Sequence, residues 1–170
     1  MTHPQSNLEL IQEKIYTTDT LVQRLLSWRF LGKKIVFTNG CFDLLHKGHV
    51  HYLAQAHELG DILIVGLNSD ASVRTLGKGS SRPLQDEASR AFILASLHFV
   101  SAVVVFNEST PAELIAQVQP DVLVKGGDYQ DLTQIAGYDT VMSSGGLITT
   151  IPFIEGYSTS AIENKISARS

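Results

Sequence analysis

The sequence contains a single cysteine, Cys41, among its 170 residues. One cysteine cannot form an internal disulfide or, by itself, a cysteine-based zinc cluster, so we expect Cys41 to be a small packed side chain. No apolar run approaches the roughly 20 residues that span a bilayer, and residues 1–7 have no hydrophobic signal core. We therefore expect a soluble, cytoplasmic protein.

Basic residues are also scarce, with 13 Lys and Arg against 17 Asp and Glu. Proteins dedicated to nucleic acids or anionic membranes normally need a surplus of cations, so we expect neither partner, although a local basic pocket is still allowed. An apolar content of 44% at this length fits a globular domain with a sizeable core. We expect an N-terminal helical extension over residues 1–30 and a catalytic domain over residues 31–170.

Strand and helix patterns alternate along the chain without an internal repeat. This alternation is typical of a parallel sheet covered by helices, and predicts an α/β, Rossmann-like, doubly wound sheet of about five strands. Strands are expected at residues 33–38, 62–67, 100–106, 121–124 and 147–151. Helices are expected at 8–28, 48–59, around 70–76, and at 86–97, 111–118 and 158–166.

The segment from Thr38 to His49 carries two imidazoles, His46 and His49, where an apolar strand gives way to a helix. A helix start presents unpaired N–H groups and the positive end of the helix dipole, which suits a phosphate group. Gly48 between the histidines lets the backbone approach a ligand closely. The pattern indicates nucleotide chemistry. A zinc pair or ordinary surface histidines are the alternatives, but no further ligand cluster accompanies the pair.

Polar side chains follow the other expected strands as well. Short polar residues at 68–70 follow the second strand, Lys125–Tyr129 the fourth, and Gly156–Ser160 the last. Because ligands collect at the carboxyl ends of parallel strands, we expect these groups to converge on one edge of the sheet. A glycine-containing loop at residues 77–83 adds two cations, Lys78 and Arg82.

In this order, the blocks resemble the nucleotidyltransferase superfamily that carries the His-x-Gly-His signature. The resemblance covers about residues 31–166, and within the superfamily the pattern is most similar to the heptose 1-phosphate adenylyltransferases. It implies transfer of AMP from ATP to D-glycero-β-D-manno-heptose 1-phosphate, giving ADP-heptose and pyrophosphate for lipopolysaccharide or surface-glycan precursors. The blocks that carry it are Asn39–Asp43, His46–His49, Gly66–Asp70, Lys78–Pro83, Arg90, Lys125–Tyr129 and Tyr157–Ser160.

The resemblance also implies roles for individual residues. The catalytic residues would be His46, His49 and Lys78, which contact the phosphates and stabilise the transition state. The residues that would bind the nucleotide are Phe42, Gly48, Arg90, Ser158 and Thr159. The residues that would bind the sugar phosphate are Asp43, Lys125, Gly126 and Asp128.

Ordinary structural roles stay open for several of these residues. Lys78 could be a solvated loop lysine, and Arg90 could form a surface salt bridge. Ser158 and Thr159 could simply cap the last helix, and Asp43 could stabilise the turn that contains it. Arg82, Asn68 and Asp70 are weaker candidates for ligand contacts, and helix capping is favoured for the last two.

Mg²⁺ is expected to accompany ATP, held largely by the phosphates rather than by a metal site of the protein. Relatives are often dimers, so we expect a homodimer. Many relatives also carry a fused sugar kinase, and here we expect that kinase to be a separate protein. Two alternatives remain. A cytidylyltransferase for a small alcohol phosphate, such as glycerol 3-phosphate, is disfavoured because Phe153 stands where those relatives have arginine. A non-catalytic nucleotide-binding regulator would not need the histidine pair and Lys78.

Overall fold

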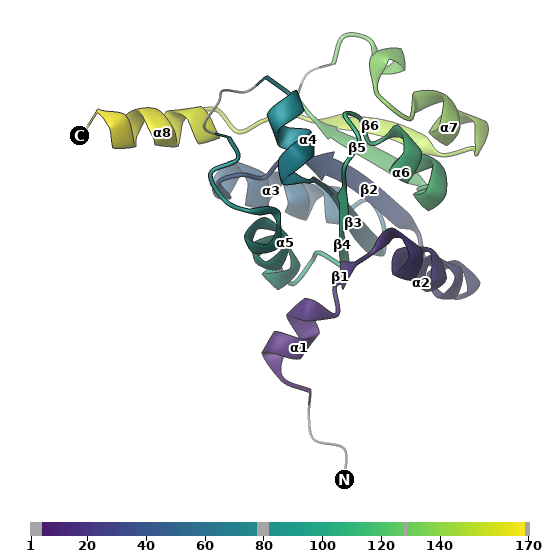
Figure 1. The fold of residues 1–170 in the computed structure, drawn as a ribbon. Coiled ribbons are helices and arrows are strands. Elements are labelled where there is room, and N and C mark those ends of the chain that lie inside the picture. Colours follow the sequence, from purple (N-terminus) through teal and green to yellow (C-terminus); the bar gives the residue numbers. More distant parts are fainter. Residues whose placement is uncertain (1–4, 78–81, 128, 169–170) are drawn as a thin grey trace.

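The computed structural model describes residues 5–77, 82–127 and 129–168. A parallel six-stranded sheet lies at its centre, with helices on both faces (Figure 1). The Rossmann-like fold expected from the sequence is confirmed. The strands are β1 (Ile15–Tyr16), β2 (Ile35–Gly40), β3 (Ile62–Asn68), β4 (Ala102–Phe106), β5 (Val122–Gly126) and β6 (Leu147–Ile151).

Helices connect these strands and cover both faces of the sheet. They are α1 (Asn7–Gln12), α2 (Thr18–Phe30), α3 (Lys47–His57), α4 (Asp70–Thr75), α5 (Glu87–Ser96), α6 (Ala112–Val118), the short 3₁₀ helix η1 (Leu132–Gln134), α7 (Tyr138–Ser143) and α8 (Thr159–Ser167). The sequence pattern did not predict η1 or α7. Helix α8 extends away from the body of the molecule, and none of its described residues is buried (Figure 1).

The strand order is β1-β4-β3-β2-β5-β6. The chain builds the sheet from β2 through β3 to β4 on one side, then returns to place β5 and β6 on the other side of β2. The strand order therefore reverses between β2 and β5, which is where ligands bind in open sheets of this kind.

Two hydrophobic clusters hold the layers together, one on each face of the sheet. Helices α2, α6 and α7 cover one face, and α3 and α5 cover the other (Figure 1). Strand residues such as Ile35 and Phe37 are completely buried because both faces are covered, which explains the nearly continuous apolar runs in the sequence. The helix residues in these clusters include Leu21, Leu25, Trp28, Leu114, Ile115, Val118, Val141, Tyr52, Leu53, Ala56, Ala91, Leu94 and Ala95.

The N-terminal segment differs from the single helix expected over residues 8–28. It forms α1 and α2 with the edge strand β1 between them, and Ile15 of β1 pairs with Val103 of β4. Thr17 caps α2 through a capping box. Strand β1 accounts for the sixth strand. The domain boundary after residue 30 stays a prediction, but the structure joins both sides of it in one sheet and one core.

Candidate active site

The sheet opens at its carboxyl edge between β2 and β5. The backbone ladder between these strands pairs Val36 with Val122 and Phe37 with Leu123. The ladder from β2 to β3 continues as far as Gly40. Strands β2 and β5 thus pair over a shorter length, and they stop pairing at the point where the strand order reverses. This is the geometry of a ligand crevice at a topological switch point.

Two side-chain contacts bridge the opening. The Tyr52 hydroxyl lies 2.6 Å from Thr38 Oγ1 and donates to the carbonyl oxygen of Val124 at 3.1 Å. Burial raises the pKa of Tyr52, so its hydroxyl stays protonated and acts as a fixed bridge. Nearer the ends of the strands, Lys125 Nζ donates to Asn39 Oδ1 at 2.6 Å.

A cavity of about 830 Å³ lies at this edge of the sheet. This volume suits a small molecule of nucleotide size. Among the described residues that line it, three carry basic side chains, His49, Arg82 and Lys125, and one carries a carboxylate, Asp43. The cavity is therefore locally basic although the whole chain has a net charge of −4. An anionic ligand fits this balance of charge.

The histidine pair is held rigidly at the start of α3. His46 is the N-cap residue, and its Nδ1 accepts a hydrogen bond from the His49 N–H at 3.3 Å. The two rings stack with centroids 3.8 Å apart and an angle of 17° between their planes. The ring of Phe42 meets His49 edge to face at a centroid distance of 5.2 Å. Capping and ring packing thus fix both imidazoles at the positive end of the helix.

The capping bond also determines which nitrogen of His46 can donate. Because Nδ1 accepts, the proton of the neutral ring is on Nε2. Burial lowers the pKa of His46 below its usual value, which favours the neutral ring at neutral pH. His46 Nε2–H is then available as a donor to a phosphate oxygen. An approaching phosphate would in turn favour the protonated ring, so ligand binding and proton uptake are coupled here.

Phe42 occupies an unusual backbone conformation, with φ of 46° in the left-handed region. Such a conformation costs on the order of 1 kcal/mol or more for a bulky residue and persists only when packing holds it. The Phe42 ring is 7% exposed and covers Gly40, where an added Cβ would lie 2.9 Å from the ring. The ring contacts His49 and lines the cavity.

Gly48 brings a distant part of the chain to the histidines. A Cβ at Gly48 would lie 3.1 Å from the His46 ring and 3.1 Å from Cβ of Tyr157. Glycine therefore permits the turn before α8 to lie against the start of α3. In that turn Ser158 caps α8, its hydroxyl accepting an N–H of the first helical turn at 3.1 Å. Thr159, the next residue, lines the cavity.

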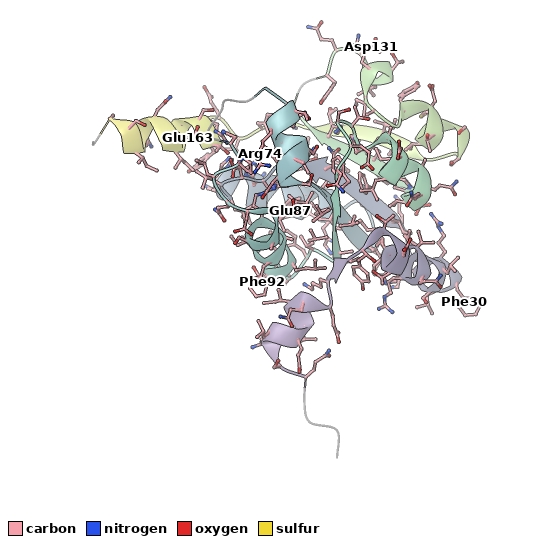
Figure 2. The ribbon with its side chains drawn as sticks, viewed as in Figure 1. Phe30, Arg74, Glu87, Phe92, Asp131 and Glu163 are labelled. Carbon is pink, nitrogen blue, oxygen red and sulfur yellow. The ribbon has the colours of Figure 1, made fainter. Side chains whose placement is uncertain are left out.

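Asp43 is 3% exposed, and its carboxylate anchors two neighbouring segments. Oδ1 accepts hydrogen bonds from the N–H groups of Leu84 and Gln85, at 2.8 Å and 3.1 Å. Oδ2 lies 3.2 Å from Nη1 of Arg82, which also pairs with Glu163 on α8. Figure 2 shows Glu163 on this projecting helix. Arg82 thus links the strand-to-helix turn to α8, and Asp43 has the structural role left open as an alternative.

Arg90 is 1% exposed, and the structure gives it a positioning role. Its Nη1 donates to the carbonyl oxygens of Cys41 and Asn68, at 2.6 Å and 2.9 Å. Its Nε donates to the carbonyl oxygen of Gln85, and its Nη2 pairs with Asp70 at 2.7 Å. Arg90 thereby ties the ends of β2 and β3 to α5. Arg90 is therefore buried and does not form the surface salt bridge considered above. A direct contact between Arg90 and the nucleotide stays a prediction, and the contacts of Arg90 within the protein do not favour it.

Many of the residues predicted from the sequence meet in one place. His46, Gly48 and Ser158 are not among the described residues that line the cavity. They lie beside it, next to the lining residues His49 and Thr159. Lys78 and Asp128 lie outside the described residues, so their roles remain predictions, as do the ligand contacts of all the others. The predicted residues that line the cavity are Phe42, Asp43, His49, Lys125, Gly126 and Thr159.

The sequence analysis missed several residues of the cavity wall. Ser109 is close to the carboxyl end of β4, so the rule that located Asn39, Asn68 and Lys125 could have found it. Nothing in the spacing pointed to Tyr52, because an aromatic residue on a helix is usually a core residue. The lining residues outside the segments named from the sequence are Tyr52, Val73, Leu76, Ser109, Pro111 and Phe153.

Comparison with known proteins identifies this arrangement. Residues 37–168, which include the histidine pair and nearly the whole sheet, match the cytidylyltransferase-like family. The chain belongs to the cytidylyltransferase-like family. This membership confirms the nucleotidyltransferase family expected from the sequence motifs. Within the described residues, no group of three or more His, Cys, Asp or Glu side chains could hold a metal ion. None of the described helices is long and apolar enough to cross a membrane.

Cytidylyltransferase-like relatives with high sequence identity include two bifunctional proteins named HldE. The protein from Wolinella succinogenes is 53% identical over 155 residues, covering 91% of this chain and 31% of the relative. The protein from Geobacter metallireducens is 54% identical over 153 residues, covering 90% of this chain and 31% of the relative. The chain therefore spans about a third of the length of the curated relatives that it matches.

Solved structures of this fold family include a lipopolysaccharide core biosynthesis protein from Thermoplasma volcanium GSS1. It is 29% identical, with a TM-score of 0.61, and the match covers 75% of this chain and all of that one. A pantoate-beta-alanine ligase from Francisella tularensis, 17% identical with a TM-score of 0.56, matches 91% of this chain and 77% of that one. The second likeness shows a shared fold alone.

Proposed function

We propose that this chain transfers AMP from ATP to D-glycero-β-D-manno-heptose 1-phosphate, releasing pyrophosphate and forming ADP-heptose. The observation that carries the proposal is the stacked pair His46 and His49 at the start of α3, beside a basic cavity at the switch point. The choice of sugar is supported by identities above 50% to HldE proteins and by the likeness to a lipopolysaccharide core biosynthesis protein. The product would serve lipopolysaccharide or surface-glycan precursor synthesis in the cytoplasm.

In the proposed reaction, an oxygen of the sugar phosphate attacks the α-phosphorus of ATP in line with the departing pyrophosphate. Both reactants are anions, so the protein must hold them together and stabilise the charge that develops on the phosphoryl oxygens. His46 and His49 would donate to oxygens of the α- and β-phosphates, and Lys78 would add a cation. The first turn of α8, from Ser158, would receive the terminal phosphates through its N–H groups.

Mg²⁺ would enter with ATP rather than occupy a site of its own on the protein. The one carboxylate in the described cavity lining, Asp43, already accepts hydrogen bonds from Leu84, Gln85 and Arg82. The described residues therefore do not fit a carboxylate cage for the ion. Phosphate oxygens and water suit Mg²⁺ as ligands, and the ion would supply charge neutralisation when it is bound.

Lys125 is the proposed cation for the sugar phosphate, and its titration gives a testable pH dependence. Burial lowers the pKa of Lys125 to about 8, from 10.5. Its positive charge is nearly complete below about pH 7, is half lost at about pH 8, and disappears as the pH rises further. Phosphate groups titrate near pH 6 and do not change over this interval. Affinity for the sugar phosphate should therefore fall above about pH 8, as measured by calorimetric titration at several pH values.

Variants of Lys125 separate this titration from other effects of pH. In Lys125→Arg the charge does not titrate, so the decline in affinity above pH 8 should disappear. Lys125→Met should bind weakly at every pH. It should also be more stable than the parent near pH 7. Burying the charged lysine lowers the stability of the parent fold, and this loss is fully present below the folded-state pKa and shrinks as the pH rises towards 10.5, the unfolded-state value. An unchanged decline in Lys125→Arg would show that another group titrates.

The homodimer remains part of the proposal. The runner-up function, cytidylyl transfer to a small alcohol phosphate, and the non-catalytic regulator can be distinguished in one assay. Pyrophosphate release is measured for ATP and CTP, each with heptose 1-phosphate and with glycerol 3-phosphate. The proposed function predicts release only with ATP and the heptose. Release only with CTP would favour the runner-up, and no release with any pair would favour the regulator.

A further inference from the structure

Phe153 is an aromatic side chain with no part in the mechanism above. It follows β6, lines the cavity, and is 67% exposed. Most large apolar side chains of this chain are buried in the two clusters on the faces of the sheet. Leaving so much of a phenyl ring in water forgoes the free energy that burial would provide, roughly 25 cal/mol for each Å² of apolar surface. A ligand that covers the ring would recover it.

One side of the Phe153 ring is fixed by two glycines. A Cβ at Gly126 would lie 2.5 Å from Cε1 and 2.8 Å from Cζ of the ring, and a Cβ at Gly127 would lie 3.1 Å from Cε2. The ring thus lies directly on the backbone at the end of β5. Gly127 N–H donates to the carbonyl oxygen of Ile151 at 2.9 Å, which holds this backbone beside the end of β6. The ring has a firm support on one side and an exposed surface on the other.

We propose that the exposed side of Phe153 stacks on the heterocyclic base of the nucleotide. This inference rests on the proposed function and assigns the base subsite within it. A planar apolar ring suits a base, which stacks on aromatic side chains through its π-face. The position also fits the phosphates, because Phe153 lies five residues before Ser158, the cap of α8.

The other side of the cavity suits the sugar. Asn68, at the end of β3, provides a side-chain amide there, which matches the hydroxyl groups of a sugar. Asn68 ends β3 and Phe153 follows β6, and these strands are three positions apart in the sheet. Strand spacing places them about 14 Å apart, far enough for the base and the sugar to occupy separate subsites.

The test compares ATP with tripolyphosphate, which keeps the phosphate chain and lacks the base. Calorimetric titration of Phe153→Ala should show binding of ATP weakened roughly tenfold or more, with tripolyphosphate binding unchanged. Phe153→Tyr should restore ATP binding because it keeps the ring. Phe153→Ala should weaken the binding of CTP less than the binding of ATP, because a pyrimidine covers less of the phenyl ring than a purine does. Phe30→Ala is the matched control, because Phe30 is 91% exposed at the end of α2, away from the cavity (Figure 2).

A second variant tests the support under the ring. Gly126→Ala should displace Phe153 and weaken ATP binding, whereas the same change in a Phe153→Ala background should have little further effect. Unchanged ATP binding in Phe153→Ala, equal losses for ATP and tripolyphosphate, or a loss confined to the sugar phosphate would each overturn the assignment. Because these are binding measurements, they stand even if the chain proves inactive towards heptose 1-phosphate.

Discussion

Replacing either histidine of the stacked pair should lower turnover by something on the order of 10²-fold or more, as when one oxyanion donor is removed from an active site. His46 and His49 are held in place by the α3 cap and by ring stacking, so their donors need little reorganisation when charge develops on the phosphates. Steady-state kinetics of His46→Ala and His49→Ala with ATP and heptose 1-phosphate would measure this effect. Near-normal turnover in either variant would contradict the assigned role.

Two further variants separate catalysis from folding. His46→Ala removes a helix cap and should cost about 1 kcal/mol of stability. His46→Asn keeps a good capping residue, so it should recover that stability while turnover stays low. His51→Ala is the matched control, because His51 is an exposed residue on the same helix. Recovery of turnover in His46→Asn would mean that His46 acts only as a cap.

Arg90→Ala should destabilise the fold by about 3–5 kcal/mol, since it removes the buried partner of a partly exposed ion pair and leaves backbone carbonyl groups without their donors. The guanidinium donates hydrogen bonds to the backbone carbonyl oxygens of Cys41, Asn68 and Gln85 and to the carboxylate of Asp70. No smaller side chain can replace these four contacts. Urea unfolding of the parent and the variant gives the free energies to compare.

The matched control for Arg90 is Arg74→Ala, which removes an exposed arginine of α4 (Figure 2). Its free energy of unfolding should change by less than about 0.5 kcal/mol. Arg90→Lys keeps the charge but cannot reproduce the planar set of donors, so it should remain clearly destabilised. A stable Arg90→Ala protein with a raised KM for ATP would contradict the positioning role and support the nucleotide contact expected from the sequence.

The sheet and most of the site could be predicted from the sequence because both depend on local patterns. Buried strands read as apolar runs, and polar residues such as Asn68 and Lys125 follow them directly. Strand β1 could not be predicted in this way, because two residues, Ile15 and Tyr16, carry no periodicity of their own. They form a strand only because the edge of β4 supplies hydrogen-bonding partners.

The roles of single polar residues were harder to predict than their location. The position of Arg90 on its helix is compatible with contact to a ligand or with contact to other parts of the protein. Only the structure shows that its guanidinium binds the ends of β2 and β3. Asp43 is similar, because its hydrogen bonds go to residues about 40 positions later in the chain. Long-range contacts of this kind have no signature in the spacing of one segment.

Phosphorus NMR of the products tests the central claim most directly. The protein is incubated with ATP, Mg²⁺ and D-glycero-β-D-manno-heptose 1-phosphate, with His49→Ala as the control. Attack at the α-phosphorus predicts equal amounts of pyrophosphate and of a new sugar-linked diphosphate, strongly reduced in His49→Ala. Formation of ADP and orthophosphate, or recovery of both substrates unchanged, would contradict the account.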